Sequence, residues 1–153
     1  MVEDILLEDI IKHAHQICSE NSVKLTTKRE HVLSALIQAS EAMSAYELAE
    51  QYRDIFEQSI PAMSVYRILD FLAEHSLVHK LTSANKYIAC SHITCSHSHD
   101  VPQFLICEIC NSVSEISVKK SVMSELTASV EKTGFKLSTS QLELKGICQS
   151  CQQ

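Results

Sequence analysis

The chain has 153 residues, of which 45% are apolar, and it carries a formal net charge of −6. This length suits one ordinary domain or two small ones, and the apolar fraction is sufficient for a soluble core. No apolar run approaches the ~18 residues of a membrane-spanning helix, so we expect no membrane span. Seven cysteines, together with an acidic N-terminus that lacks the features of a secretion signal, indicate a reducing compartment. In such a compartment metal ligation or redox chemistry is more common than disulfide bonding.

The negative charge is concentrated in residues 1–90, which hold 8 Lys and Arg against 13 Asp and Glu. This balance argues against indiscriminate binding of nucleic acid, which depends on neutralising phosphates. Two strips of the chain nevertheless contain cations and no carboxylate. They are residues 21–29, with Lys24, Lys28 and Arg29, and residues 75–99, with two lysines and several histidines. A specific DNA site carried by local basic strips is therefore compatible with the acidic total.

The first part of the chain has the periodicity of helices. Apolar residues recur at helical spacing over residues 3–19, and a second helix is predicted from Thr26 or Thr27 to about Ala39. Ser44 and Glu47 have the spacing of a capping box, in which each side chain accepts a hydrogen bond from the other residue's backbone amide. This box predicts a third helix that extends to about Phe56.

A fourth helix and a hairpin are predicted next. Ser64 is expected to cap the fourth helix, so Tyr66 and Arg67 would lie in its first turn, and residues 77–90 read as two short strands around a turn at 82–85. Helices followed by a hairpin are the order of a winged helix-turn-helix, whose last helix enters the major groove. There Arg67 could pair with guanine, and Tyr46 holds the matching place in the third helix. A generic helical domain with a hairpin is the alternative reading of the same pattern.

The remaining residues predict a second, smaller unit. Residues 91–102 lack an apolar period and indicate a linker. Two strands are expected between Phe104 and Val118, then a helix over 120–133 stopped by Gly134, then a strand from Phe135 to Lys145, after which Gly146 turns the chain. A unit of about 50 residues buries little surface by itself, so zinc and dimerisation are the two obvious supports.

The predicted fold class is α+β, in three parts. We expect residues 1–90 to form an N-terminal winged helix-turn-helix DNA-binding domain and residues 91–102 to form a hinge rich in histidine and cysteine. We expect residues 103–153 to form a small C-terminal α/β dimerisation domain with structural zinc.

Four cysteines form two C-x-x-C pairs, Cys107 with Cys110 and Cys148 with Cys151. Two intervening residues let both sulfurs of a pair reach one ion, and two pairs make the tetrahedral four-thiolate shell of structural zinc. A redox C-x-x-C is the alternative, but it needs a single pair at a helix N-terminus and has no use for a second. The 37 residues between the pairs must hold a folded segment.

A second group of metal donors surrounds the predicted hinge. A single histidine there is most simply a solvent-exposed linker residue, but four histidines and two cysteines within 21 residues favour a metal site. A metal held by mixed sulfur, nitrogen and oxygen donors from both domains could fix the angle between them and so control DNA binding. The candidate donors are His79, Cys90, His92, Cys95, His97, His99 and Glu115.

Together these motifs resemble the ferric uptake regulator family over nearly the whole chain. The cysteine that ends the hairpin, where iron sensors usually offer histidine or glutamate, is most similar to the zinc-sensing branch of that family. The likeness also rests on a His-rich linker, the two C-x-x-C pairs and the runs Leu25–Arg29, Ser44–Leu48, Ser64–Leu72, Leu77–Lys80 and Asn85–Cys90.

The resemblance implies a cytoplasmic homodimer that is not an enzyme and that represses zinc-uptake genes when loaded with metal. Its partner would be double-stranded operator DNA, A·T-rich and with dyad symmetry, and it would act without a membrane or a small-molecule substrate. Two readings stay open beside it. One is a sensor of iron, manganese or peroxide from the same family, and the other is a zinc-bearing thiol oxidoreductase.

The resemblance also assigns residues, with two zinc ions per chain. The structural zinc ligands would be Cys107, Cys110, Cys148 and Cys151. The regulatory ligands would be His79, Cys90, His99 and Glu115, with His97 and Cys95 as alternates. Tyr46 and Arg67 would read bases, and Lys24 and Arg29 would contact phosphates. The start of the fourth helix and the basic strip add Ser64, Tyr66 and Lys28 as further candidate DNA contacts.

Overall fold

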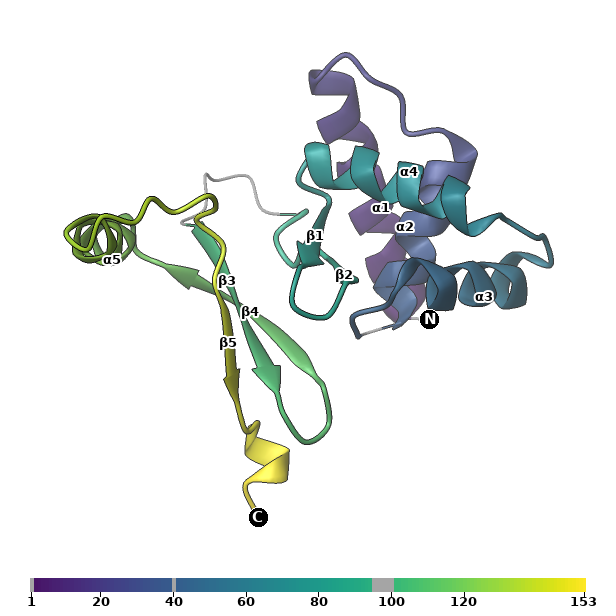
Figure 1. The fold of residues 1–153 in the computed structure, drawn as a ribbon. Coiled ribbons are helices and arrows are strands. Elements are labelled where there is room, and N and C mark those ends of the chain that lie inside the picture. Colours follow the sequence, from purple (N-terminus) through teal and green to yellow (C-terminus); the bar gives the residue numbers. More distant parts are fainter. Residues whose placement is uncertain (1, 40, 95–100) are drawn as a thin grey trace. The chain divides into compact units, whose positions relative to one another are not determined.

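The computed structural model describes residues 2–39, 41–94 and 101–153, which are drawn in colour in Figure 1. The chain divides into two compact units, Met1–Cys95 and Ser96–Gln153. Each unit is described by itself below. Among the described residues, no helix combines the length and the apolar character needed to cross a membrane.

Helices form most of the first unit. Their core is made of side chains that recur at helical spacing, such as Leu48 with Tyr52 and Val65 with Leu69, all of which are buried. The predicted first and second helices are confirmed within the usual uncertainty of helix ends. The helices are α1 (Val2–Glu20), α2 (Thr27–Ala39), α3 (Ala45–Phe56) and α4 (Ala62–Glu74).

The capping box at the start of α3 is confirmed. The Glu47 amide donates to Ser44 Oγ over 3.2 Å, and the Ser44 amide donates to Glu47 Oε2 over 2.7 Å. The bond from the Ser44 amide, supported by the nearby Lys86, lowers the pKa of Glu47. The helix ends at Phe56, and the following cap residue Glu57 adopts the left-handed conformation with φ of 53°.

The predicted cap of α4 is wrong. Pro61, with φ of −62°, occupies the cap position without a side-chain hydrogen bond, and the helix begins at Ala62. The amides of Ser64 and Val65 donate to the Pro61 carbonyl over 2.9 and 3.1 Å. Because proline fixes φ at a value compatible with a helix start, the helix begins before the hydroxyl residue. Ser64 therefore lies inside the first turn.

The predicted hairpin is confirmed as β1 (Val78–Leu81) and β2 (Lys86–Ala89), which pair antiparallel. Met43, just before α3, extends this sheet, since its amide and carbonyl exchange hydrogen bonds of 2.9 and 2.8 Å with those of Tyr87. The hairpin is thus bonded to the start of α3. The arrangement is the predicted winged helix-turn-helix, with β1 and β2 as the wing (Figure 1).

The second unit contains a three-stranded sheet and a helix. The central strand β3 (Val101–Cys107) pairs antiparallel with β4 (Val113–Val118) and parallel with β5 (Glu143–Gly146). Helix α5 (Lys120–Glu131) connects β4 to the segment before β5, and Gly134, with φ of 86°, lies just beyond its end. A 3-10 turn over Gln149–Cys151 follows β5.

Two boundaries in this unit differ from the prediction. Val101 and Pro102 belong to β3 rather than to the linker, because they pair with Val118 and Ser117. The predicted strand over residues 135–145 is also too long, since β5 contains only its last part and includes Gly146.

The buried side chain of Gln103 explains the shorter strand. Its Nε2 donates to the Ser140 carbonyl over 2.8 Å, and its Oε1 accepts from the Leu142 amide. A side chain of β3 therefore satisfies backbone groups that a strand ladder would otherwise pair.

We expect Ser44→Ala to destabilise the first unit by about 1 kcal/mol, because the substitution removes the acceptor of the capping box. Urea unfolding followed by circular dichroism would measure the loss. Ser44→Thr keeps the acceptor and serves as the control. An unfolding midpoint that is the same in Ser44→Ala as in the unsubstituted protein would contradict the role given to the box.

Candidate metal centre and nucleic-acid interface

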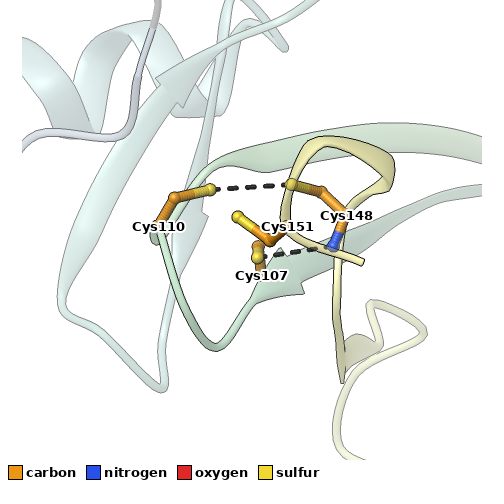
Figure 2. A group of neighbouring side chains, drawn as sticks. All are labelled: Cys107, Cys110, Cys148 and Cys151. Atoms are coloured by element: carbon orange, nitrogen blue, oxygen red, sulfur yellow. Dashed lines mark hydrogen bonds between the residues drawn. The ribbon is translucent and has the colours of Figure 1, made fainter. Parts of the chain in front are cut away.

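The two cysteine pairs lie at one end of the sheet of the second unit. Cys107 is the last residue of β3 and is paired with Gly146, the last residue of the parallel strand β5. Cys110 lies in the turn after β3, and Cys148 and Cys151 follow β5 directly. The parallel register therefore brings together cysteines that are far apart in the sequence. Figure 2 shows the four side chains converging.

The distances among the four sulfurs fit a single tetrahedral ion. All four lie within 4.8 Å of one another, and Cys110 Sγ is 3.7 Å from Cys148 Sγ. Four thiolates that bind zinc at about 2.3 Å have sulfurs about 3.8 Å apart, from tetrahedral geometry. The residues present thus suit zinc, and the predicted ligand set is brought together.

Polar groups around the cluster distribute its charge unevenly. Backbone N–H groups of Cys110, Cys148 and Ile109 face Cys107 Sγ and lower the pKa of that thiol to about 6. The amide of Cys148 lies 3.4 Å from this sulfur. The Ser112 hydroxyl, whose oxygen is 3.1 Å from Cys110 Sγ, lowers the pKa of the Cys110 thiol.

The thiol of Cys151, in contrast, retains its proton. Hydrogen bonding to Cys148, together with burial and the other sulfurs, raises the pKa of Cys151 to about 12. Negative charge therefore collects on Cys107 when no cation is bound. A divalent cation would displace the remaining protons.

The wing brings two further donors together. His79 is the second residue of β1, and Cys90 follows β2 with its amide bonded to the Leu77 carbonyl over 2.9 Å. A ring nitrogen of His79 and the sulfur of Cys90 lie within 4.8 Å of each other. The wing therefore offers an imidazole and a thiol at a spacing that one metal ion can bridge.

The other predicted regulatory donors lie outside the wing strands. Glu115 is partly buried on β4 of the second unit, where it pairs with Phe104. His92 lies in the turn after the wing, and its amide donates to Cys90 Sγ over 3.4 Å. Cys95, His97 and His99 lie outside the described residues.

Three predicted DNA-contacting residues lie close together on α3 and α4. Tyr46 is in the first turn of α3 and is 66% exposed. Its ring meets that of Tyr66 edge to face, with centroids 6.2 Å apart. Arg67 is exposed beside Tyr66, and both lie in the second turn of α4 rather than in the first, because the helix begins at Ala62.

The predicted phosphate contacts differ from one another. Lys24 and Lys28 are exposed, before α2 and at its start. Arg29 instead lies with its guanidinium carbon 3.6 Å from the centre of the Phe71 ring and donates to the Lys24 carbonyl over 2.8 Å. Arg29 thereby ties the start of α2 to α4, and its contact with phosphate stays a prediction.

Two supporting residues were missed by the sequence reasoning. Lys86 on the wing forms an ion pair of 3.3 Å with Glu47, which the sequence assigned only to the cap. Ser112 supports Cys110, as described above. The two residues of the ion pair are 39 positions apart, so no local pattern could have indicated it.

We expect Cys107→Ser to lose the zinc of the cysteine cluster and to loosen the second unit, because a metal shell with three thiolates binds more weakly. Elemental analysis after gel filtration and limited proteolysis would measure the two effects. Cys18→Ala, which alters a buried cysteine of the first unit, is the matched control. A stable Cys107→Ser protein with unchanged zinc content would rule out this site.

Zinc affinity at the cysteine cluster should rise with pH. The raised pKa of Cys151 keeps that thiol protonated at neutral pH, and zinc binds the thiolate, so binding must release this proton. The association constant should increase with pH between pH 7 and 9, by about tenfold per pH unit for each proton that zinc displaces. Competition with a chromophoric chelator at several pH values would measure it, and a constant affinity over this range would contradict the assignment.

The comparisons with known proteins agree with this geometry. A model of the ferric uptake regulator family matches residues 20–145. The zinc uptake regulation protein of Escherichia coli (strain K12) is 34% identical over 152 residues, which cover 98% of this chain and 85% of that protein.

Two solved structures are also similar. A zinc uptake regulator complexed with zinc and DNA has a TM-score of 0.80 and 31% identity, and the match covers 95% of this chain and 94% of that one. The crystal structure of holo XcZur has a TM-score of 0.74 and 36% identity, with 92% and 95% covered. The family model alone spans most of the sequence, and so the chain belongs to the ferric uptake regulator family.

Proposed function

We propose that this chain is a zinc-responsive repressor that binds operator DNA as a homodimer and controls genes of zinc uptake. The observation that carries the proposal is the pairing of His79 with Cys90 on the wing of a DNA-binding fold. The extended similarity to zinc uptake regulators, one of them solved with zinc and DNA, supports it.

Two zinc ions per chain would have separate tasks. The four-cysteine site would hold its ion permanently, since the second unit buries few side chains among its described residues: Gln103, Phe104, Cys107 and Met123. A metal cross-link between the turn after β3 and the end of the chain adds stability that so small a core does not provide.

The regulatory ion would bind His79 and Cys90. In the proposal the set is completed by Glu115 and by a histidine between the wing and β3, His99, with His97 and Cys95 as alternates. A thiolate among nitrogen and oxygen donors suits zinc better than manganese or ferrous iron. Bound zinc would limit the conformations of the segment that follows the wing, and its occupancy could then set the geometry for DNA binding.

Specific contacts would supply most of the DNA affinity. The first 90 residues carry more carboxylates than cations, so the general attraction to phosphate is weak. Tyr46, Tyr66 and Arg67 would meet base edges, with Ser64 in the first turn of α4. Lys24, Lys28 and Arg29 would meet phosphates. A homodimer presents two identical recognition helices, so the operator should have dyad symmetry, and we expect it to be A·T-rich.

The second unit supports the homodimer. Seven large apolar side chains are exposed among its described residues, and two of them, Leu105 and Leu144, are register partners on β3 and β5. Exposed apolar surface of this kind is typical of an interaction site. In the proposal a second copy of this chain covers these side chains, and the dimer acts on DNA in the cytoplasm. These side chains are Leu105, Ile109, Val122, Leu126, Phe135, Leu144 and Ile147.

The second candidate is a sensor of iron, manganese or peroxide with the same fold. The several histidines around the wing favour it, since imidazole also suits iron. Competition among the metals at buffered free concentrations separates the two candidates. The thiol oxidoreductase reading is not retained, because the family to which the chain belongs consists of transcription regulators.

A titration of DNA binding against buffered free zinc tests the proposal. Fluorescence anisotropy with operator DNA should show binding only when zinc is present, and mild chelation should abolish it while one zinc per chain remains. Cys90→Ser and His79→Ala should weaken the zinc-induced affinity at least tenfold, in line with the loss of a metal ligand. His13→Ala, an exposed histidine on α1, should behave like the unsubstituted protein. Binding that is independent of every metal tested would refute the proposed function.

A further inference from the structure

Exposed apolar side chains are few in the described part of the first unit. The large ones are Leu6, Tyr46 and Met63, which are 59%, 66% and 66% exposed. Two of the three, Tyr46 and Met63, lie in the first turns of α3 and α4. A single exposed apolar residue is ordinary and needs no explanation, so the argument depends on what surrounds Met63.

Helical geometry places Met63 on the face that carries the predicted base contacts. Tyr66 and Arg67 follow it by three and four positions, and residues at these spacings are neighbours on one helix face. Tyr66 in turn meets Tyr46 edge to face across the two helices. We call Tyr46, Met63, Tyr66 and Arg67 the reading face. Met63 is its member nearest the start of α4.

The start of α4 has no side-chain cap, because Pro61 makes no side-chain hydrogen bond, and Met63 in the first turn is 66% exposed. In helix-turn-helix proteins the N-terminal residues of the recognition helix are the ones that meet base edges. Met63 is therefore placed to meet base edges in the DNA major groove, since it lies closer to the helix N-terminus than Tyr66 and Arg67.

We propose that Met63 is a specificity-determining residue that contacts the methyl group of a thymine in the major groove. The inference rests on the DNA-binding function proposed above and adds to it one residue and one class of base. Thymine is the base that presents an apolar group in the major groove, and apolar side chains recognise it by contact. Methionine is flexible and polarisable, so it can follow the methyl group without a fixed rotamer.

The division of roles on the reading face follows from chemistry. Arg67 has the donors for guanine O6 and N7, whereas Met63 has neither a strong donor nor a strong acceptor. Each half of the operator should therefore contain a position read by hydrogen bonding and another read by its methyl group. The second kind of position is the one that an A·T-rich operator would supply.

Deoxyuridine substitution tests the proposal, because deoxyuridine differs from thymidine only by the missing methyl group. The operator is first selected from random duplex DNA with the zinc-loaded protein, and each thymine is then replaced in turn. The unsubstituted protein should lose about fourfold in affinity at one or two positions per half-site, as expected for one buried methyl group. Met63→Ala should bind the full operator more weakly and should be indifferent to replacement at those positions.

Two controls make the result specific. Met63→Leu keeps an apolar side chain of similar size and should keep the deoxyuridine profile, as should Leu6→Ala, which removes the exposed apolar residue of α1. Zinc content and circular dichroism establish that each variant is folded. Equal sensitivity of Met63→Ala and the unsubstituted protein at every thymine would overturn the inference, and so would a profile without any sensitive thymine. If the zinc-loaded protein selects no duplex at all, the proposed function fails as well.

Discussion

The parallel pairing of β5 with β3 is the constraint on which the second unit depends. It sets Cys107 opposite Gly146 and so brings both cysteine pairs to one end of the sheet. The segment between the pairs returns the backbone to that end of the sheet. It leaves along β4, continues through α5 and the residues bonded to Gln103, and comes back along β5. A metal ion at the cluster closes a long loop, and the sheet holds the sulfurs within the reach of one ion. Sheet and metal therefore support each other.

In the first unit the wing is the element that connects the proposed metal ligands to the start of α3. Its strand β2 is bonded on one side to β1, which carries His79, and on the other to Met43, which precedes α3. Lys86 of the same strand pairs with Glu47, a member of the capping box that begins α3. The residues proposed to bind the regulatory metal and the start of a helix proposed to meet DNA are thus joined by one short sheet. That sheet is a continuous connection of backbone hydrogen bonds, to which the ion pair of Lys86 with Glu47 adds a side-chain contact.

Features set by local spacing could be predicted from the sequence, and features set by distant contacts could not. The capping box at Ser44 and the two C-x-x-C pairs each have a short, recognisable spacing, and both are present. The meeting of the two pairs depends on the register of β5 with β3, which the spacing within each pair does not give. The length of β5 depends on Gln103, which is 39 positions from Leu142. The role of Arg29 depends on its contact with the distant Phe71 ring. The place of Met63 in the first turn of α4 depends on the helix beginning at Ala62. The prediction of a cap at Ser64 was wrong for a local reason, because the helix begins after Pro61 without a side-chain hydrogen bond.

The acidic charge of the first unit increases the share of the DNA affinity that the proposed specific contacts must supply. A protein that neutralises many phosphates binds DNA whatever its conformation, because counterion release supplies the affinity. Here carboxylates outnumber cations in the first 90 residues, so that term is small and short-range contacts at the reading face must supply most of the affinity. Such contacts require α3 and α4 of both protomers to fit their half-sites together. The proposed regulatory ion would both fix the geometry and add local positive charge at the wing, and these two effects would separate the bound state from the free one.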